Sequence, residues 1–261
     1  MTRPLFLMST LLLLVAQVHA ASLPDSGQTV CDDGTHVMAA CSLNNTSDAA
    51  PLPRQDGRFG RDPKAAAGTL VKIGAGAAGF DYTKVGNNGS DLAAAAALGV
   101  NPADWACTRD NVTGLTWEVK TATNTDLRFS GHTYTWYSTD ATTNGGSAGV
   151  TGANTCNATL PGNLCNTQAL VTAVNSAALC GASDWRLPTR RELFTLVHLG
   201  VSNPSIDPTY FSNTPASGFW SASSYVPSPT GAWDVGFFDG FTFGNGKGNN
   251  SYVRLVRGGQ F

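Results

Sequence analysis

Six cysteines constrain this 261-residue chain more than any other feature of its sequence. They follow a leader, residues 1–20, with the pattern of a secretory signal peptide: Arg3, an apolar run over 5–18, and small residues before position 21. An even number of cysteines behind such a leader indicates disulfides, because exported proteins fold in oxidising surroundings. Other pairings are open, but spacing favours two short loops and one long link. The predicted pairs are Cys31–Cys41, Cys156–Cys165 and Cys107–Cys180.

Metal binding by these cysteines is the rival interpretation. It is disfavoured because the sequence has no Cys-x-x-Cys motif and its four histidines are scattered. No metal and no cofactor are therefore predicted.

The leader predicts an exported protein, either periplasmic or extracellular, and leaves its oligomeric state open. Its apolar run is shorter than the roughly 20 residues that a helix needs to span a bilayer. No later stretch is long and apolar enough to insert into a membrane.

Charge is scarce in this chain. Asp, Glu, Lys and Arg make up 13% of the residues, against about 25% in an average soluble domain, and glutamate occurs only at Glu118 and Glu192. The formal net charge of −2 excludes a strongly basic nucleic-acid binder. Because 42% of the residues are hydrophobic, the chain can still build a core. A surface of Asn, Thr, Ser and Gly suits neutral sugars better than polyanions.

Periodicity predicts a mixed order of elements after a turn-rich stretch at 51–62. Alternation of Leu115, Trp117 and Val119 predicts a strand, and 167–179 has helical spacing. A second helix begins at a capping box of Thr189 and Glu192. The last third predicts strands at 219–222, 233–238 and 252–257, with a Gly/Asn loop at 239–251. Strand, two helices, long loop and then several strands indicate an α+β fold, not a doubly wound parallel sheet.

Four of these segments carry a resemblance to a known family. They begin at Cys107, Asp184, Phe219 and Val253 and read CTRDNVTGLTWEVKT, DWRLPTRREL, FWSAS and VRLVR. Together they resemble the Lcl C-terminal domain family, a bacterial family of unknown function named for a collagen-like adhesin that binds sulfated polysaccharide. The resemblance covers about residues 105–261, and the chain has no collagen-like Gly-X-Y tract.

The resemblance implies a C-type-lectin-like fold, akin to the formylglycine-generating sulfatase modifiers. Such a fold has two helices, mostly antiparallel strands and long loops, here stapled by disulfides. The predicted organisation is a signal peptide at 1–20, an irregular N-terminal extension at 21–104 that packs on the core, and an Lcl C-terminal-like domain at 105–261.

Most charged residues in the family motifs are interpreted as structural. Arg186 is expected to pair with Glu118 or Glu192 rather than to anchor a ligand. Four further arginines are expected to be surface charges rather than a patch for anionic glycans; they are Arg190, Arg191, Arg254 and Arg257.

The candidate ligand contacts lie near the predicted loop at 239–251. Alternation places Trp233, Val235 and Phe237 in the core, which leaves aromatic and amide side chains on or beyond the opposite face. The candidate set is Asp234, Phe238, Asp239, Phe241, Phe243, Asn245, Asn249 and Asn250. The tripeptides of calcium-dependent sugar binders, Glu-Pro-Asn, Gln-Pro-Asp and Trp-Asn-Asp, are absent.

The sequence therefore predicts an exported, non-catalytic, adhesin-like module that binds a glycan or another surface polymer. One alternative is a structural or protein-interaction domain of the cell envelope. The other is a relative of the formylglycine-generating oxidases, although no position matches their reactive cysteine pair.

Overall fold

The computed structural model describes residues 24–31, 39–40 and 55–259. The predicted signal peptide and Cys41 lie outside these residues. None of the helices in the described part is long and apolar enough to cross a membrane.

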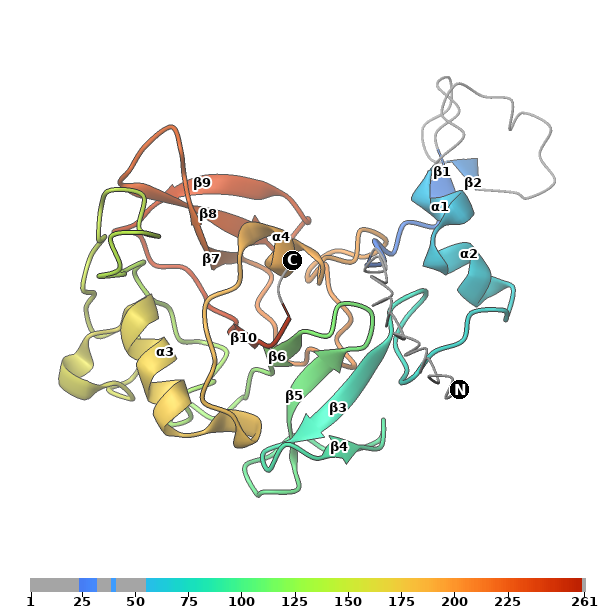
Figure 1. The fold of residues 1–261 in the computed structure, drawn as a ribbon, viewed down its shortest axis with the longest axis horizontal. Helices are drawn as coiled ribbons and strands as arrows, with labels where there is room; N and C mark the ends of the chain where they lie inside the picture. Colours follow the sequence, from blue (N-terminus) through green and yellow to red (C-terminus); the bar gives the residue numbers. More distant parts are fainter. Residues whose placement is uncertain (1–23, 32–38, 41–54, 260–261) are drawn as a thin grey trace, which may run out of the picture.

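Two antiparallel sheets form the body of the molecule (Figure 1). The larger has the strand order β10-β6-β5-β3-β4, and the smaller has the order β7-β8-β9. The larger sheet consists of β3 (Tyr82–Gly86), β4 (Asp91–Leu92), β5 (Trp105–Asp110), β6 (Thr116–Glu118) and β10 (Val256–Arg257). The smaller consists of β7 (Gly218–Ser224), β8 (Gly231–Gly236) and β9 (Thr242–Gly246). The short strands β1 (Val30–Cys31) and β2 (Ala39–Ala40) pair with each other.

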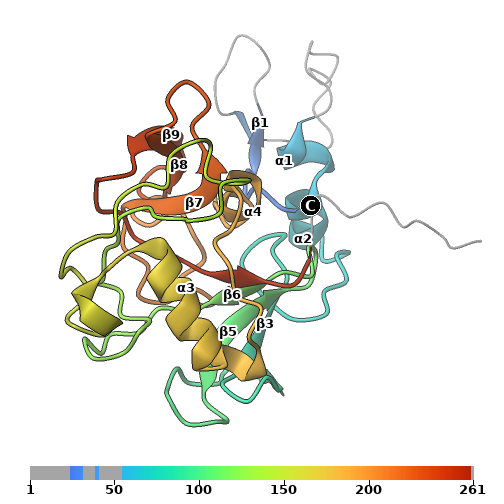
Figure 2. The ribbon, with the colours of Figure 1, turned by 60° about the vertical axis from the view of Figure 1, so that its left-hand side comes forward.

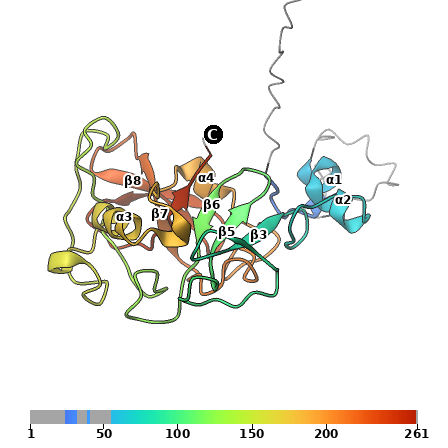
Figure 3. The same cartoon turned by 60° about the horizontal axis from the view of Figure 1, so that its bottom comes forward.

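The helices are few and short. The predicted pair is present as α3 (Thr167–Ser176) and α4 (Arg190–Phe194). Of two more, α1 (Asp56–Phe59) lies within the stretch at 51–62 that was expected to be turn-rich, and α2 (Arg61–Ala66) begins there and extends beyond it. They lie together at the end of the molecule far from α3 (Figure 3). Antiparallel strands, few helices and long loops confirm the α+β class.

The larger sheet joins residues on both sides of position 104. Strand β3 pairs along β5, with Val85 opposite Cys107 and Lys84 opposite Thr108. The segment before the family motifs thus supplies two strands, β3 and β4, to the sheet that those motifs build.

The core has two clusters of buried side chains. One surrounds α3 and both described disulfides and includes Trp136, Trp185 and Trp220. The other lies beneath α4 and includes Trp117, Phe219 and Phe237.

Disulfides tie the first cluster together. Cys107–Cys180 links β5 to the turn after α3, and Cys156–Cys165 closes a loop that precedes α3. Two of the three predicted disulfides, Cys107–Cys180 and Cys156–Cys165, are therefore confirmed. Cys31 is also disulfide-bonded, and its predicted partner Cys41 lies outside the described residues.

Local sequence signals explain how α4 begins. The Thr189 hydroxyl accepts from the Glu192 amide, and the Glu192 carboxylate accepts from the Thr189 amide at 2.8 Å, which is the predicted capping box. Arg186 donates two hydrogen bonds to Glu192, at 2.7 and 2.9 Å. Burial disfavours the charged form of Glu192, but the bonds from Arg186 and Thr189 hold its pKa below the usual value. The other predicted partner of Arg186, Glu118, lies elsewhere.

Glu118 instead belongs to a fully buried charged network. Its carboxylate binds Lys120 Nζ at 2.7 Å and the Leu255 amide at 2.9 Å. Arg254 donates to the Glu118 carbonyl at 2.6 Å and to the Thr214 hydroxyl at 2.7 Å. Burial lowers the pKa of Lys120, an effect that the attraction of Glu118 opposes.

The expectation that Arg254 is a surface charge is therefore wrong. Its side chain is completely buried, and its guanidinium lies 5.1 Å from the centre of the Phe211 ring. The cause is that its segment is covered on both faces. Tyr252 bridges to Phe219 in the smaller sheet, whereas β10 begins only at Val256 and pairs with β6 in the larger one. Arg257 remains near the surface, where it pairs with Asp184 at 2.6 Å.

Replacing Glu118 by Gln should lower the free energy of unfolding by about 3–5 kcal/mol, because it leaves Lys120 and Arg254 buried without the opposing charge. Arg257→Gln, which breaks a partly exposed pair, should cost less than about 1 kcal/mol and serves as the control. Urea unfolding followed by tryptophan fluorescence measures both. Equal midpoints for E118Q and the unsubstituted protein would show that the network contributes nothing to stability.

Candidate functional site

The structure divides the ligand contacts predicted from sequence between a buried group and exposed side chains. The expected loop at 239–251 contains strand β9. Phe243 and Asn245 of β9 lie on the same face of the sheet as Asp234 of β8, because Phe243 is the strand partner of Asp234 and Asn245 that of Ala232. Asp234 is completely buried and accepts from Asn245 at 3.0 Å and from the Ser251 hydroxyl at 2.6 Å. Having no exposed surface, Asp234 supports this face from within, and the prediction that it contacts sugar is wrong.

The other members of that set lie nearer the surface. Asn249, which is exposed, donates to Asn245 at 2.7 Å, and Asn250 is exposed beside it. Phe238 and Phe243 are partly exposed, and Phe241 keeps 70% of its surface exposed at the turn between β8 and β9. Asp239 accepts from the Phe241 amide at 3.0 Å, which shapes this turn. Both the amides and the aromatic rings are accessible, and none of these described residues lines the two hollows that follow.

A buried lysine near these residues was not expected from the sequence. Lys247 donates to the carbonyls of Asn144, Ser147 and Pro229 at 2.7, 2.7 and 2.9 Å. Its ammonium also lies 4.1 Å from the centre of the Trp136 ring. A single charge thus holds two long loops against the end of β9, and no local pattern identifies such a lysine.

A large hollow lies on the other side of the smaller sheet. It is a cleft of about 610 Å³ between α4, β9 and the N-terminal segment, which here means residues 24–29 before β1. Figure 2 shows α4 lying between the smaller sheet and the helices α1 and α2. Its apolar wall comes mainly from α4 and the residues after it. The lining residues are Pro24, Asp25, Ser26, Arg190, Arg191, Phe194, Thr195, Val197, Leu199 and Thr242.

A second, smaller hollow adjoins this cleft and shares two arginines with it. It measures about 220 Å³ and is lined by Thr189, Arg190, Arg191, Ser223 and Trp233. The Arg190 guanidinium lies 4.4 Å from the centre of the Trp233 ring, close enough for a cation–π contact. Tyr225 packs edge-on against the same ring at 5.0 Å.

The structure corrects the expectations for Trp233 and Arg190. Val235 and Phe237 are buried as predicted, but Trp233 is only partly buried and faces α4. Arg190 was expected to be solvated and instead lies on that tryptophan. The combination was not foreseen because α4 and β8 are more than thirty residues apart.

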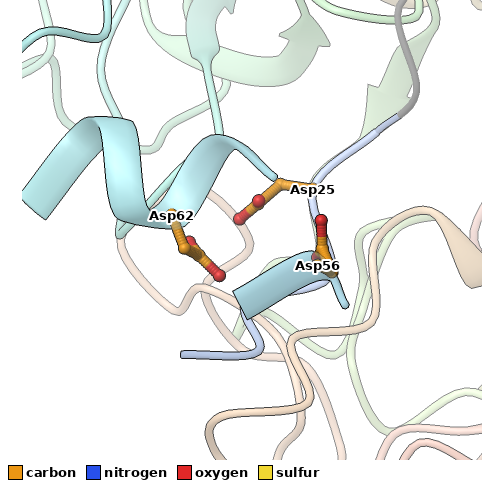
Figure 4. A group of neighbouring side chains, drawn as sticks. All are labelled: Asp25, Asp56 and Asp62. Atoms are coloured by element: carbon orange, nitrogen blue, oxygen red, sulfur yellow. The ribbon is translucent and has the colours of Figure 1, made fainter. Parts of the chain in front are cut away.

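One group of acidic side chains in the described part of the chain has metal-ligating spacing (Figure 4). It consists of Asp25, which precedes β1, Asp56 at the start of α1, and Asp62 in α2. Each offers a carboxylate oxygen, and these oxygens lie within 4.8 Å of one another. Burial and the neighbouring carboxylates of Asp62 and Asp56 raise the pKa of Asp25 to about 7.

Fold and site together define a disulfide-stapled α+β domain with a basic, aromatic cleft beside a short capped helix. The family model of the Lcl C-terminal domain matches residues 106–257, more than half of the chain, and the protein belongs to that family. No curated protein matches the sequence. No solved structure matches it either, so the C-type-lectin-like likeness implied by the family stays a prediction.

Asp234 should make this protein less stable as the pH rises from 5 to 8. Burial raises its pKa from the ordinary 3.8 to about 6, against the opposing hydrogen bonds of Ser251 and Asn245. The folded state therefore holds this proton after the unfolded chain has lost it, and the stabilisation disappears as the pH passes 6. The loss is on the order of 1 kcal/mol.

Thermal unfolding of the unsubstituted protein and of Asp234→Asn across this pH range tests that expectation. Because Asn does not titrate, its curve should fall less steeply than that of the unsubstituted protein. Parallel curves would mean that Asp234 is ionised throughout the range.

Proposed function

We propose that this protein is an exported, non-catalytic module that binds an acidic glycan in the cleft beside α4. The observation that carries the proposal is the junction of an apolar cleft with a hollow that contains Arg190, Arg191 and Trp233. Apolar and aromatic side chains pack against the C–H faces of sugar rings. Guanidinium groups bind carboxylate or sulfate through paired, charge-assisted hydrogen bonds.

The distribution of charge supports an acidic ligand. In a chain with few ions, most of the other arginines are engaged: Arg186 pairs with Glu192, Arg109 with Asp91, and Arg257 with Asp184. Among the described residues, neither Arg190 nor Arg191 forms a salt bridge. Two adjacent cations at the junction of the two hollows therefore favour an anionic sugar over the neutral one that composition alone suggested.

The chemistry of the described residues supports binding rather than catalysis. Cys107, Cys180, Cys156 and Cys165 are joined in disulfides, so none offers the reactive thiol that the oxidase alternative requires. His132 and His198 are buried against aromatic rings in different parts of the molecule.

Export in an oxidising compartment is part of the proposal. If all six cysteines form disulfides, as the sequence predicts, the denatured but unreduced protein should contain no titratable thiol. Reaction with a thiol reagent before and after reduction measures this. One or more free thiols without reductant would reopen the oxidase alternative.

Glycan binding should depend on Arg190 and Trp233. Calorimetry with a sulfated or uronate-containing oligosaccharide and its neutral counterpart of equal length should show tighter binding of the acidic one, weakening as salt increases. Arg190→Ala and Trp233→Ala should each reduce affinity about tenfold or more, or roughly 1.4 kcal/mol. Arg109→Ala, which removes a partly exposed arginine from the larger sheet, should leave affinity unchanged.

The double variant Asn249→Ala/Asn250→Ala separates the cleft from the polar face predicted by sequence. A loss of affinity in this variant, with R190A unaffected, would move the site to that face. Failure of a glycan array to show binding to acidic or neutral glycans would reject glycan recognition and favour the protein-interaction alternative.

A further inference from the structure

The acidic group of Asp25, Asp56 and Asp62 lies where the segment before β1 meets the α1–α2 pair, outside the part of the chain that the family model matches. Asp25 and Asp62 are almost completely buried, with only 4% and 3% of their surfaces exposed. One oxygen of each, Asp25 Oδ1 and Asp62 Oδ2, accepts no hydrogen bond from a donor group in the described part of the chain, and the two carboxyl groups lie within hydrogen-bonding reach of each other. Figure 4 shows the carboxylates of the group directed toward one another.

The remaining oxygens of the group are held by neutral donors. Asp62 Oδ1 accepts from the Gly79 amide at 2.8 Å, and Asp25 Oδ2 accepts from the Gly27 amide at 3.2 Å. The Ser26 hydroxyl donates to Asp56 Oδ2. These bonds fix the carboxylates without neutralising them. Among the described residues, none of the three forms a salt bridge with a cationic side chain.

Backbone packing keeps other side chains out of the group. A Cβ atom at Gly60 would collide with the Asp56 carboxylate, and one at Gly79 would lie 2.6 Å from Asp25 Oδ1. Two glycines therefore allow the main chain to approach the carboxylates closely.

Buried carboxylates without partners are costly, and they are normally paired, protonated or bound to a metal. A shared proton can satisfy one pair of carboxylates, but it leaves the third negative charge next to that pair. A divalent cation can be bound by all three carboxylates at once, and it offsets two of their three negative charges. The absence of His and Cys from the group favours a hard cation, and oxygens within 4.8 Å of one another fit around one ion with Ca–O distances of about 2.3–2.6 Å.

We propose that Asp25, Asp56 and Asp62 form a binding site for a calcium ion. The ion joins the α1–α2 pair to the N-terminal segment. That segment is fixed in turn to the body of the protein, because the Ser26 carbonyl accepts from the Leu199 amide at 2.9 Å and Gly27 packs against His198. Calcium thereby adds a further link between the N-terminal segment and the α1–α2 pair.

Calorimetric titration of the mature protein with CaCl₂, after removal of metals with a chelator, tests the site. We expect one calcium ion per chain, a higher thermal unfolding temperature with calcium than with chelator, and slower proteolysis within α1 and α2. Asp62→Asn and Asp25→Asn should each weaken calcium binding at least tenfold. Asp56→Asn, which changes the least buried of the three, should weaken it while leaving the protein folded.

Asp140→Asn is the matched control, because Asp140 is an exposed aspartate that binds only its own turn. It should bind calcium as the unsubstituted protein does. Absence of calcium binding, together with a higher unfolding temperature for D25N than for the unsubstituted protein, would show that the carboxylates share a proton and would overturn the proposal. Binding that is equally strong in D56N, D62N and D140N would place the ion elsewhere and would also overturn it. The calcium titration contains no glycan, so a failure to bind calcium does not bear on the proposed glycan binding.

Discussion

The buried contact between Glu118 and Arg254 is the constraint on which the rest of the fold depends. Arg254 binds the Glu118 carbonyl, and the Glu118 carboxylate binds the amide of the next residue, Leu255. These bonds fix β6 against the segment that crosses from the smaller sheet to the larger one. Because the ions have no access to water, neighbouring segments must satisfy every polar atom of the network or destabilise it. Charges that are scarce in the sequence thus determine how the two sheets meet.

Features set by neighbouring residues could be predicted from the sequence. The capping box needs only Thr189 and Glu192, and close spacing suggested Cys156–Cys165. The long-range pair Cys107–Cys180 was predicted as the one left after the closely spaced cysteines were paired. The burial of Arg254 could not be predicted. Alternation shows that Arg254 points to the opposite face of the strand from Val253 and Leu255, but it does not show whether other parts of the chain cover that face. The covering residues include Thr214, forty positions earlier in the chain.

The candidate site was harder to predict than the fold for a similar reason. Asn245 and Phe243 stand out in sequence because they lie in a Gly- and Asn-rich stretch. In the structure much of that stretch is strand β9, and the Asn245 side chain donates a hydrogen bond to the buried Asp234. The cleft arises where α4 crosses a distant sheet and brings Arg190 over Trp233. The available signal was weak: two adjacent arginines on a helix of five residues. That neither arginine pairs with an acidic side chain among the described residues becomes visible only in three dimensions.

The N-terminal segment connects the cleft with the acidic group. Asp25 and Ser26 line the cleft, while Asp25 also belongs to the group and Ser26 donates to Asp56. The position of one wall of the cleft therefore depends on how the negative charge behind it is compensated. Without compensation, repulsion among the carboxylates works against the contacts that hold residues 25 and 26 in place. A bound divalent cation would reduce that repulsion and would also reduce the negative potential next to Arg190 and Arg191. The same ion would then make the cleft both firmer and more attractive to an anion.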